Sequence, residues 1–143
     1  MKITSEAVRK DIAAIWPDLQ FILLSDPAWW DPDVAEVQEF LQTSGIEKLP
    51  YIEGIHECEE FSLQLVAELR RRRAEKAVAG MIPKNELLNW PFGFVFGTRF
   101  AGRDLDHWMG ITHTRQGLWL IEPQTDAIWT PSRDRDQVLF LFM

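Results

Sequence analysis

Three residues of the chain, Cys58, His107 and Glu122, have the types and the order that covalent acyl-transfer chemistry requires. Cys58 is the only cysteine among 143 residues, and it stands at the start of a predicted helix. The positive end of a helix dipole and its unpaired backbone N–H groups favour a thiolate there. The glutamates on both sides of the cysteine oppose this effect, so a nucleophilic Cys58 needs a protonated histidine as its partner.

His107 and Glu122 are predicted to lie on one face of a β-hairpin. If residues 114–117 form a tight connection, His113 lies opposite Leu118, and His107 becomes a diagonal neighbour of Glu122. Glu122 can then orient the imidazole and stabilise its charged form, while His107 exchanges a proton with the thiol. A change of hairpin register by one residue would place the two side chains on opposite faces.

Three further side chains are predicted to support this site. Gln124 is placed to assist an oxyanion or to hold Glu122, and Trp108 either lines or blocks a substrate groove. His56 precedes the helix and is a candidate to modulate the thiol. His113 is interpreted as a side chain that fills the sheet or lies at its surface, because it stands at the hairpin end.

Two metal sites compete with this interpretation. The first would use ligands suited to zinc: Cys58, His56, His107 and Glu122. The second would use carboxylates that are weak candidates for a hard cation such as calcium: Glu59, Glu60, Asp104 and Asp106. Neither set has the close spacing of a structural zinc site or an EF-hand, so the sequence requires no cofactor.

The elements that must position these residues are helical in the first half and extended in the second. Helices are predicted from Ser5 to the residue before Pro17, from Asp31-Pro32 to Ser44-Gly45, and over 58–79, where Gly80 supplies a stop. Strands are predicted over 92–100, 108–114, 118–123, 127–129 and 138–143. This order, helices followed by an antiparallel meander, predicts one α+β domain over 1–143, with a helical segment over 1–83 packed on a C-terminal antiparallel sheet over 84–143.

The composition narrows the class of partner. Fifteen Lys and Arg against 22 Asp and Glu give a net charge of −7, which disfavours nucleic acid and anionic membranes as partners. No apolar run approaches the roughly 18 residues of a membrane span, and the N-terminus lacks the apolar core of a signal peptide. A single cysteine cannot form an intramolecular disulfide, so we expect a reducing, cytoplasmic location. The four arginines at 70–73 are interpreted as the solvated end of a helix, and the apolar residues 138–143 as a buried strand or a homodimer interface.

These features resemble the papain-like and transglutaminase-like cysteine protease superfamily. The matching motifs are Gly54-x-x-x-Cys58-x-x-Phe61, Gly80-x-Ile82-Pro83, His107-Trp108 and Glu122-Pro123. The Cys58–Phe61 and Trp119–Gln124 segments look closest to the C-terminal protease domain of the fairy-ring mushroom agglutinin. The resemblance implies a papain-like α+β fold, a Cys-His-Glu triad, a peptide or amide substrate, and activation by calcium.

The sequence also departs from that pattern. Papain-like enzymes place an oxyanion-binding Gln six residues before the cysteine, where this chain has Ile52, and relatives usually carry a small residue in place of Trp108. The leading hypothesis is a cysteine hydrolase, peptidase or amidase, or an acyl-transferase. The alternatives are a catalytically inactive papain-like protein that binds a partner, and a metal-binding structural domain.

Overall fold

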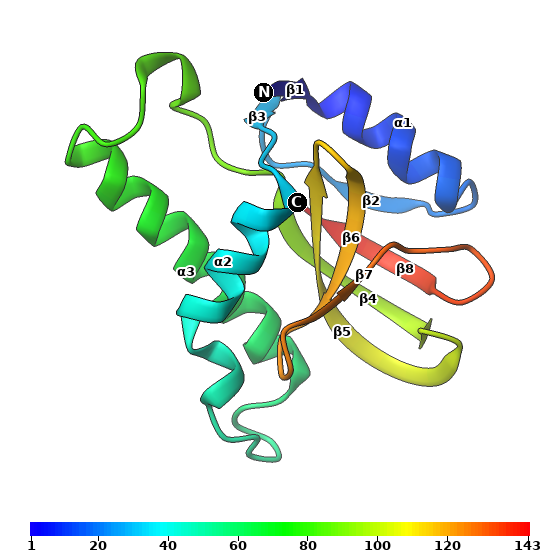
Figure 1. Cartoon of the computed structure of the whole chain (residues 1–143). Coiled ribbons are helices and arrows are strands. Elements are labelled where there is room, and N and C mark those ends of the chain that lie inside the picture. Colours follow the sequence, from blue (N-terminus) through cyan, green and yellow to red (C-terminus); the bar gives the residue numbers. More distant parts are fainter.

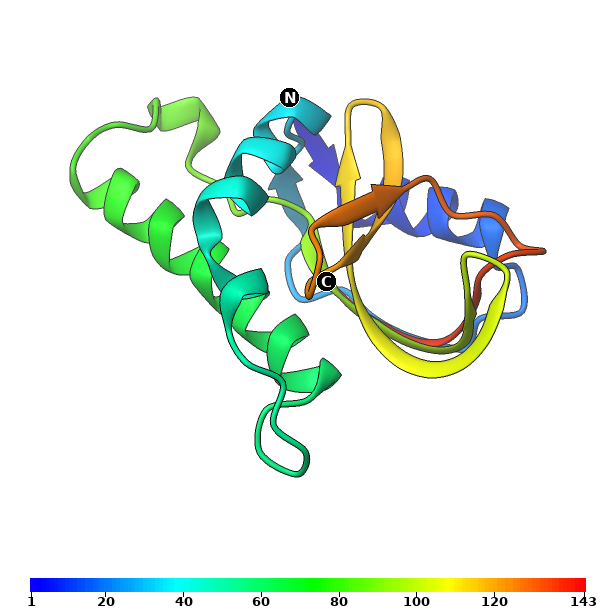
Figure 2. The same cartoon turned by 60° about the horizontal axis from the view of Figure 1, so that its bottom comes forward.

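The computed structural model describes residues 1–143 and confirms the predicted α+β architecture (Figure 1). Three long helices precede most of a six-stranded sheet: α1 (Ser5–Ile15), α2 (Val34–Ser44) and α3 (Cys58–Val78). The strands run across the sheet in the order β2 (Phe21–Leu23), β8 (Gln137–Phe142), β4 (Phe92–Phe100), β5 (Arg103–Thr114), β6 (Gly117–Glu122) and β7 (Ala127–Trp129). Helix α1 covers one face, and α2 and α3 cover the other (Figures 1 and 2).

The helix starts differ from the prediction by one to two residues. Thr4, and not Ser5, caps α1, because its Oγ1 accepts a hydrogen bond from the Ala7 N–H at 3.2 Å. Asp33, and not Asp31, caps α2, and it forms a reciprocal capping box with Glu36. Helix α3 begins at Cys58 as predicted.

The first half also contains three short strands, so the predicted helical segment over 1–83 is only partly helical. β1 (Lys2–Thr4) pairs with β3 (Ala28–Trp30) in an antiparallel ribbon, and β2 pairs with β8 in parallel. Three-residue strands show no periodicity, and their partners lie far away along the chain, which explains why pattern analysis missed the β1–β3 ribbon. The single-domain assignment stays a prediction.

The predicted strands of the β half are all present, and β4 to β7 form an antiparallel meander, but β8 departs from it and returns across the sheet to pair with β4. The bounds of β4 and β7 match the prediction, and β8 (Gln137–Phe142) is flanked by β2 and β4, so the apolar C-terminus is a strand of the sheet. Strand β5 begins five residues earlier than predicted, because residues 103–107, most of them polar, extend its pairing with β4. The β5–β6 hairpin has the predicted register, with His113 opposite Leu118.

The sheet is packed on both faces. The core under α1 joins helix and strand side chains: Val8, Ile12, Trp16, Trp29, Val95, Phe100, Met109, Ile111, Leu118, Leu120, Val138, Leu141 and Met143. The core under α2 and α3 consists of Val37, Phe40, Leu41, Leu65, Val66, Leu69, Phe92 and Ile121. A central strand buried on both sides is held rigidly, which suits β5 as a support for functional groups.

Three of the four consecutive arginines of α3 connect it to three different segments, in contrast to the predicted solvated helix end. Arg70 reaches Ser25, Arg72 donates to the Thr43 carbonyl at 2.6 Å, and Arg73 donates to the Leu88 carbonyl. Their guanidinium groups also lie over the rings of Phe142, Phe40 and Trp90, respectively. Only Arg71 pairs solely with glutamates of its own helix.

Candidate active site

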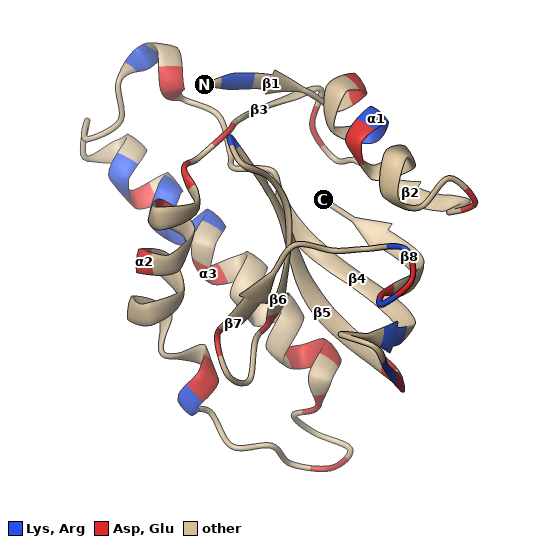
Figure 3. Cartoon of the chain, turned by 45° about the vertical axis from the view of Figure 1, so that its right-hand side comes forward, with Lys and Arg blue, Asp and Glu red and all other residues tan.

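Cys58 is the first residue of α3, and its side chain is half-buried. Glu57 is the N-cap, and its backbone N–H donates to Glu60 Oε2 at 2.9 Å in a capping box. The 21-residue helix directs its N-terminal dipole toward the thiol. Figure 3 shows acidic residues at this end of α3 and both basic and acidic residues on its later turns.

The loop before the cysteine is held to α3 by His56. One ring nitrogen lies 2.8 Å from the Pro50 carbonyl oxygen and the other 3.1 Å from Gln64 Oε1. The imidazole also packs on Phe61, with 4.1 Å between ring centroids. His56 therefore anchors the loop, and both of its nitrogens have partners other than the thiol it was predicted to modulate.

His107 and Glu122 form the pair that the hairpin register predicts. The Nε2 of His107 lies 2.8 Å from Glu122 Oε2, and both side chains are largely buried, 13% and 19% exposed. The other carboxylate oxygen, Oε1, accepts the backbone N–H of Gln124 at 3.1 Å. Gln124 was expected to hold Glu122 or an oxyanion through its side chain, but the contact it makes with Glu122 is through its backbone.

The end of β6 leaves the edge of β5 open beside this pair. The β5–β6 ladder stops at Gly110 opposite Ile121, and continuing the same register would set Trp108 opposite Pro123, which has no N–H to donate. The ladder thus ends before Trp108, and the backbone N–H of Trp108 acts on the Cys58 thiol, whose pKa it lowers. The start of α3, which carries the thiol, lies beside β5, the strand that carries His107 and Trp108 (Figure 1).

The surroundings of the thiol favour its neutral form. Burial raises the pKa of Cys58, the N–H of Trp108 opposes this, and the carboxylate of Glu59 raises it again. The sulfur also donates to Glu59 Oε2 at 3.7 Å. The predicted opposition between helix dipole and adjacent carboxylate is present, and on balance the pKa of the thiol is raised.

The indole of Trp108 belongs to a half-exposed aromatic surface on the α3 side of the sheet. Its ring centroid lies 5.3 Å from Phe96 and 6.2 Å from Phe140, and Phe94 stacks on Phe142 at 5.1 Å. Phe21 on the edge strand extends this surface and is 67% exposed. Trp108 therefore opens onto an apolar surface next to the thiol.

The two predicted metal sites are not assembled. The structure holds no group of three or more His, Cys, Asp or Glu side chains that could bind a metal ion. In the zinc set, His56 has separate partners, and in the carboxylate set Glu60 caps α3 while Asp104 pairs with Arg99 at 2.7 Å. The geometry therefore does not support the alternative of a metal-binding structural domain.

Both ring nitrogens of His113 have partners other than the thiol. It is buried, with Nδ1 2.8 Å from Asp31 and Nε2 2.9 Å from Asp11. Burial lowers its pKa, but the two carboxylates raise it more, so the pKa is raised on balance. This cluster ties α1 to β5 and occupies Asp31, which explains why Asp31 does not cap α2.

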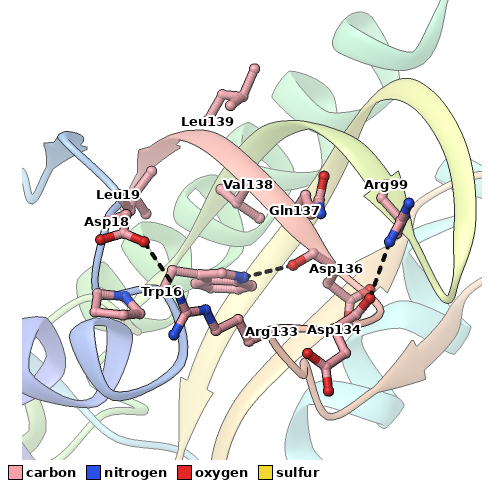
Figure 4. A pocket seen from close by; sticks show the side chains of 11 residues that line it. Trp16, Asp18, Leu19, Arg99, Arg133, Asp134, Asp136, Gln137, Val138 and Leu139 are labelled. Carbon is pink, nitrogen blue, oxygen red and sulfur yellow. Dashed lines mark hydrogen bonds and ion pairs between the residues drawn. The ribbon is translucent and has the colours of Figure 1, made fainter.

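A pocket of about 540 Å³ lies away from Cys58, between the end of α1, β8 and the loop before it (Figure 4). Its polar walls are already paired: Trp16 Nε1 donates to the Asp136 carbonyl at 2.8 Å, and Arg133 contacts Asp18 at 3.2 Å. No Cys, His or Ser lines it. Although it is the most voluminous cavity described, it lacks a nucleophile, so we place the candidate chemistry at Cys58.

Comparison with known proteins supports the fold. No family model and no curated protein matches the sequence. Solved structures do match, among them PSL1a in complex with E64, with a TM-score of 0.72 and 20% identity; the match covers 99% of this chain and 51% of that one. Another is Polyporus squamosus lectin bound to the epitope Neu5Aca2-6Galb1-4GlcNAc, with a TM-score of 0.70 and 19% identity; this match covers 99% of this chain and 49% of that one.

This likeness establishes a shared fold. The chain spans about half the length of these two proteins, 51% and 49% respectively. No helix of the structure has the length and apolar character needed to cross a membrane. At 19–20% identity the match carries no assignment of catalytic residues, so their roles rest on the geometry around Cys58.

Sequence reasoning missed two contributors to this site. The first is the Trp108 backbone N–H, although Pro123 in the facing strand was a readable signal for an open edge. The second is a contact between Glu47 and Asp126, two residues that no motif links.

Proposed function

We propose that this protein is a cysteine-dependent hydrolase of peptide or other amide bonds, with Cys58 as nucleophile, His107 as base and Glu122 as the residue that orients His107. The contact of 2.8 Å between His107 Nε2 and Glu122 Oε2 carries the proposal, together with the backbone N–H of the next residue, Trp108, which lowers the pKa of the Cys58 thiol. It combines a nucleophile, a base and an orienting group in the order that triads require.

The pairing with Glu122 selects the tautomer of His107. A carboxylate at Nε2 favours the proton on that nitrogen, which leaves the Nδ1 lone pair free to act as base. Because the pKa of the thiol is raised, we infer that Nδ1 removes the proton as sulfur attacks and does not meet a preformed thiolate.

The reaction then follows in balanced steps. Cys58 Sγ bonds to the carbonyl carbon while its proton moves to His107 Nδ1, and the oxyanion faces the Cys58 N–H at the start of α3. The C–N bond breaks, the amine takes the proton from Nδ1, and a thioester remains. Water attacks the thioester, His107 takes its proton, and the acid leaves as that proton returns to sulfur. An amine in place of water would give acyl transfer.

The substrate class rests on two supports. One structural relative is a complex with E64, a peptide-like inhibitor. The aromatic surface that includes Trp108, Phe96 and Phe140 would contact the apolar side chains of a peptide bound at Cys58. We therefore propose a peptide segment as substrate.

Thiol labelling tests the nucleophile. We expect iodoacetamide and E64 to label Cys58 at neutral pH faster than iodoacetamide labels free cysteine, and His107→Ala to remove this advantage. Ser62→Ala is a matched control, since Ser62 is buried one turn from the thiol and donates to the Cys58 carbonyl. Labelling that occurs only after unfolding would overturn the proposal.

A catalytically inactive binding protein is the second candidate. The raised pKa of Cys58 and the half-exposed aromatic surface favour it, as does Ile52 at the position of the expected oxyanion-binding Gln. This candidate predicts slow labelling of Cys58 together with binding of apolar peptides that Phe140→Ser abolishes. Peptide cleavage lost in Cys58→Ala would exclude it.

A further inference from the structure

The turn after β6 determines where the Glu122 carboxylate lies. The Glu122 carbonyl accepts hydrogen bonds from the N–H groups of Thr125 at 3.2 Å and Asp126 at 2.8 Å. The N–H of Gln124 in the same turn holds Oε1, while Oε2 faces His107. Any shift of this turn would therefore move the carboxylate relative to the imidazole.

Asp126 connects this turn to the segment that precedes Cys58. Its carboxyl group contacts Glu47, in the short 3-10 helix η1 (Ile46–Lys48) at the start of the loop that leads to α3. Ile46, which precedes Glu47, and Ile128, two residues after Asp126, pack against the same core under α2 and α3. The contact thus joins the segment before the nucleophile to the turn that carries the orienting residue.

The two carboxylates face each other without another partner. Asp126 Oδ1 and Glu47 Oε2 are both buried, and neither accepts a hydrogen bond from any donor of the protein. Two ionised carboxylates cannot bond to each other, so a hydrogen bond between them needs one shared proton. Burial, then the charge and hydrogen bond of Glu47, raise the pKa of Asp126 to about 6, and Glu47 is the only titratable group that acts on it.

We propose that Glu47 and Asp126 share a proton that positions Glu122 against His107, and that loss of this proton loosens the turn. They are positioning residues, and the inference rests on the role proposed above for Glu122. Below about pH 6 the two carboxyl groups share the proton and stay together. Above about pH 6 both are ionised, and two like charges repel across a buried contact. The protein therefore holds its imidazole best in weakly acidic solution.

Asp126→Asn tests the shared proton. Asparagine tolerates the left-handed backbone of this position, where φ is 61°, and its amide donates to Glu47 at every pH. The first readout is the NMR signal of the His107 Nε2–H, which reports the Glu122 contact whether or not Cys58 reacts. We expect it to broaden above about pH 6 in the natural protein and to persist in Asp126→Asn.

The second readout is the rate of Cys58 alkylation by iodoacetamide. We expect the ratio of the alkylation rate of Asp126→Asn to that of the natural protein to be near one at about pH 5 and to rise to about five by about pH 8. Glu47→Gln should behave alike. Asp134→Asn, which removes one exposed carboxylate from the loop before β8, is the matched control and should leave both readouts unchanged.

Each outcome separates the inference from the proposed function. A His107 signal with the same pH dependence in both proteins overturns the shared proton and its positioning role. The expected NMR difference together with an unreactive Cys58 supports the positioning pair and refutes the hydrolase. An NMR difference with reactive Cys58 but a constant rate ratio overturns positioning.

Discussion

Replacing Glu122 with Gln tests the contribution of the orienting carboxylate to the reactivity of Cys58. At about 4 Å between charge centres and an effective dielectric constant of about 20, a carboxylate and an imidazolium attract by about 4 kcal/mol. Because the two side chains are 13% and 19% exposed and Gln retains a hydrogen bond, we expect about half of this to be lost, about 2 kcal/mol. A factor of ten corresponds to about 1.4 kcal/mol, so the rate should fall about thirtyfold.

The assay is the second-order rate of Cys58 alkylation near neutral pH, followed by mass spectrometry. Glu59→Gln is the matched control with the opposite sign, because it removes the same charge from a carboxylate that lies 3.7 Å from the sulfur and raises the pKa of the thiol. We expect Glu59→Gln to increase the rate a few-fold and Glu122→Gln to decrease it. Equal rates, or an increase in both variants, would refute the proposed roles of His107 and Glu122.

Three further predictions concern stability. The pKa of His113 is raised by its two carboxylates despite burial, so its stabilising contribution is present below the unfolded pKa of about 6.5 and is lost as pH rises through the higher folded value. The urea midpoint of unfolding should therefore fall over this pH range, and Asp11→Asn should make the fall smaller. A fall of the same size in Asp11→Asn would contradict the assignment. Arg72→Ala should lower the free energy of unfolding by about 1–3 kcal/mol in the same urea titration, because Arg72 links two helices. Arg71→Ala breaks only pairs within its own helix and should lower it by less than about 0.5 kcal/mol. Equal losses in the two variants would refute this difference. Calcium and EDTA should leave the thermal midpoint unchanged, because the predicted carboxylate ligands are not gathered into one group, and a calcium-dependent rise would show otherwise.

Local signals account for the features of the site that were predicted. The start of α3 follows from a capping glutamate three residues before a second glutamate, and its end from Gly80, which adopts a left-handed φ of 69°. The pairing of His107 with Glu122 follows from the length of one hairpin connection, because a tight turn leaves little freedom of register.

Competition between distant partners explains the errors. Asp31 has the sequence context of a helix cap, but it is buried against His113, 82 residues away, and Asp33 caps instead. His56 looks like a neighbour of the thiol, but packing on Phe61 and bonds to Pro50 turn it into a loop anchor. A polar side chain with several possible partners pairs with the one that would otherwise be buried without a hydrogen bond. The sequence does not show which donors or acceptors will be buried.

The sequence by itself determined the elements that depend on contacts within a few residues: the Cys58 helix, the individual strands of the β half and the hairpin that pairs His107 with Glu122. The tertiary structure decided the surroundings of the thiol, where burial raises the pKa of Cys58 and the Trp108 N–H lowers it, and it decided the position of β8 between β2 and β4. It also decided the contact between Glu47 and Asp126. Such contacts join residues far apart in the chain, and their energies depend on burial, which only the packed fold creates.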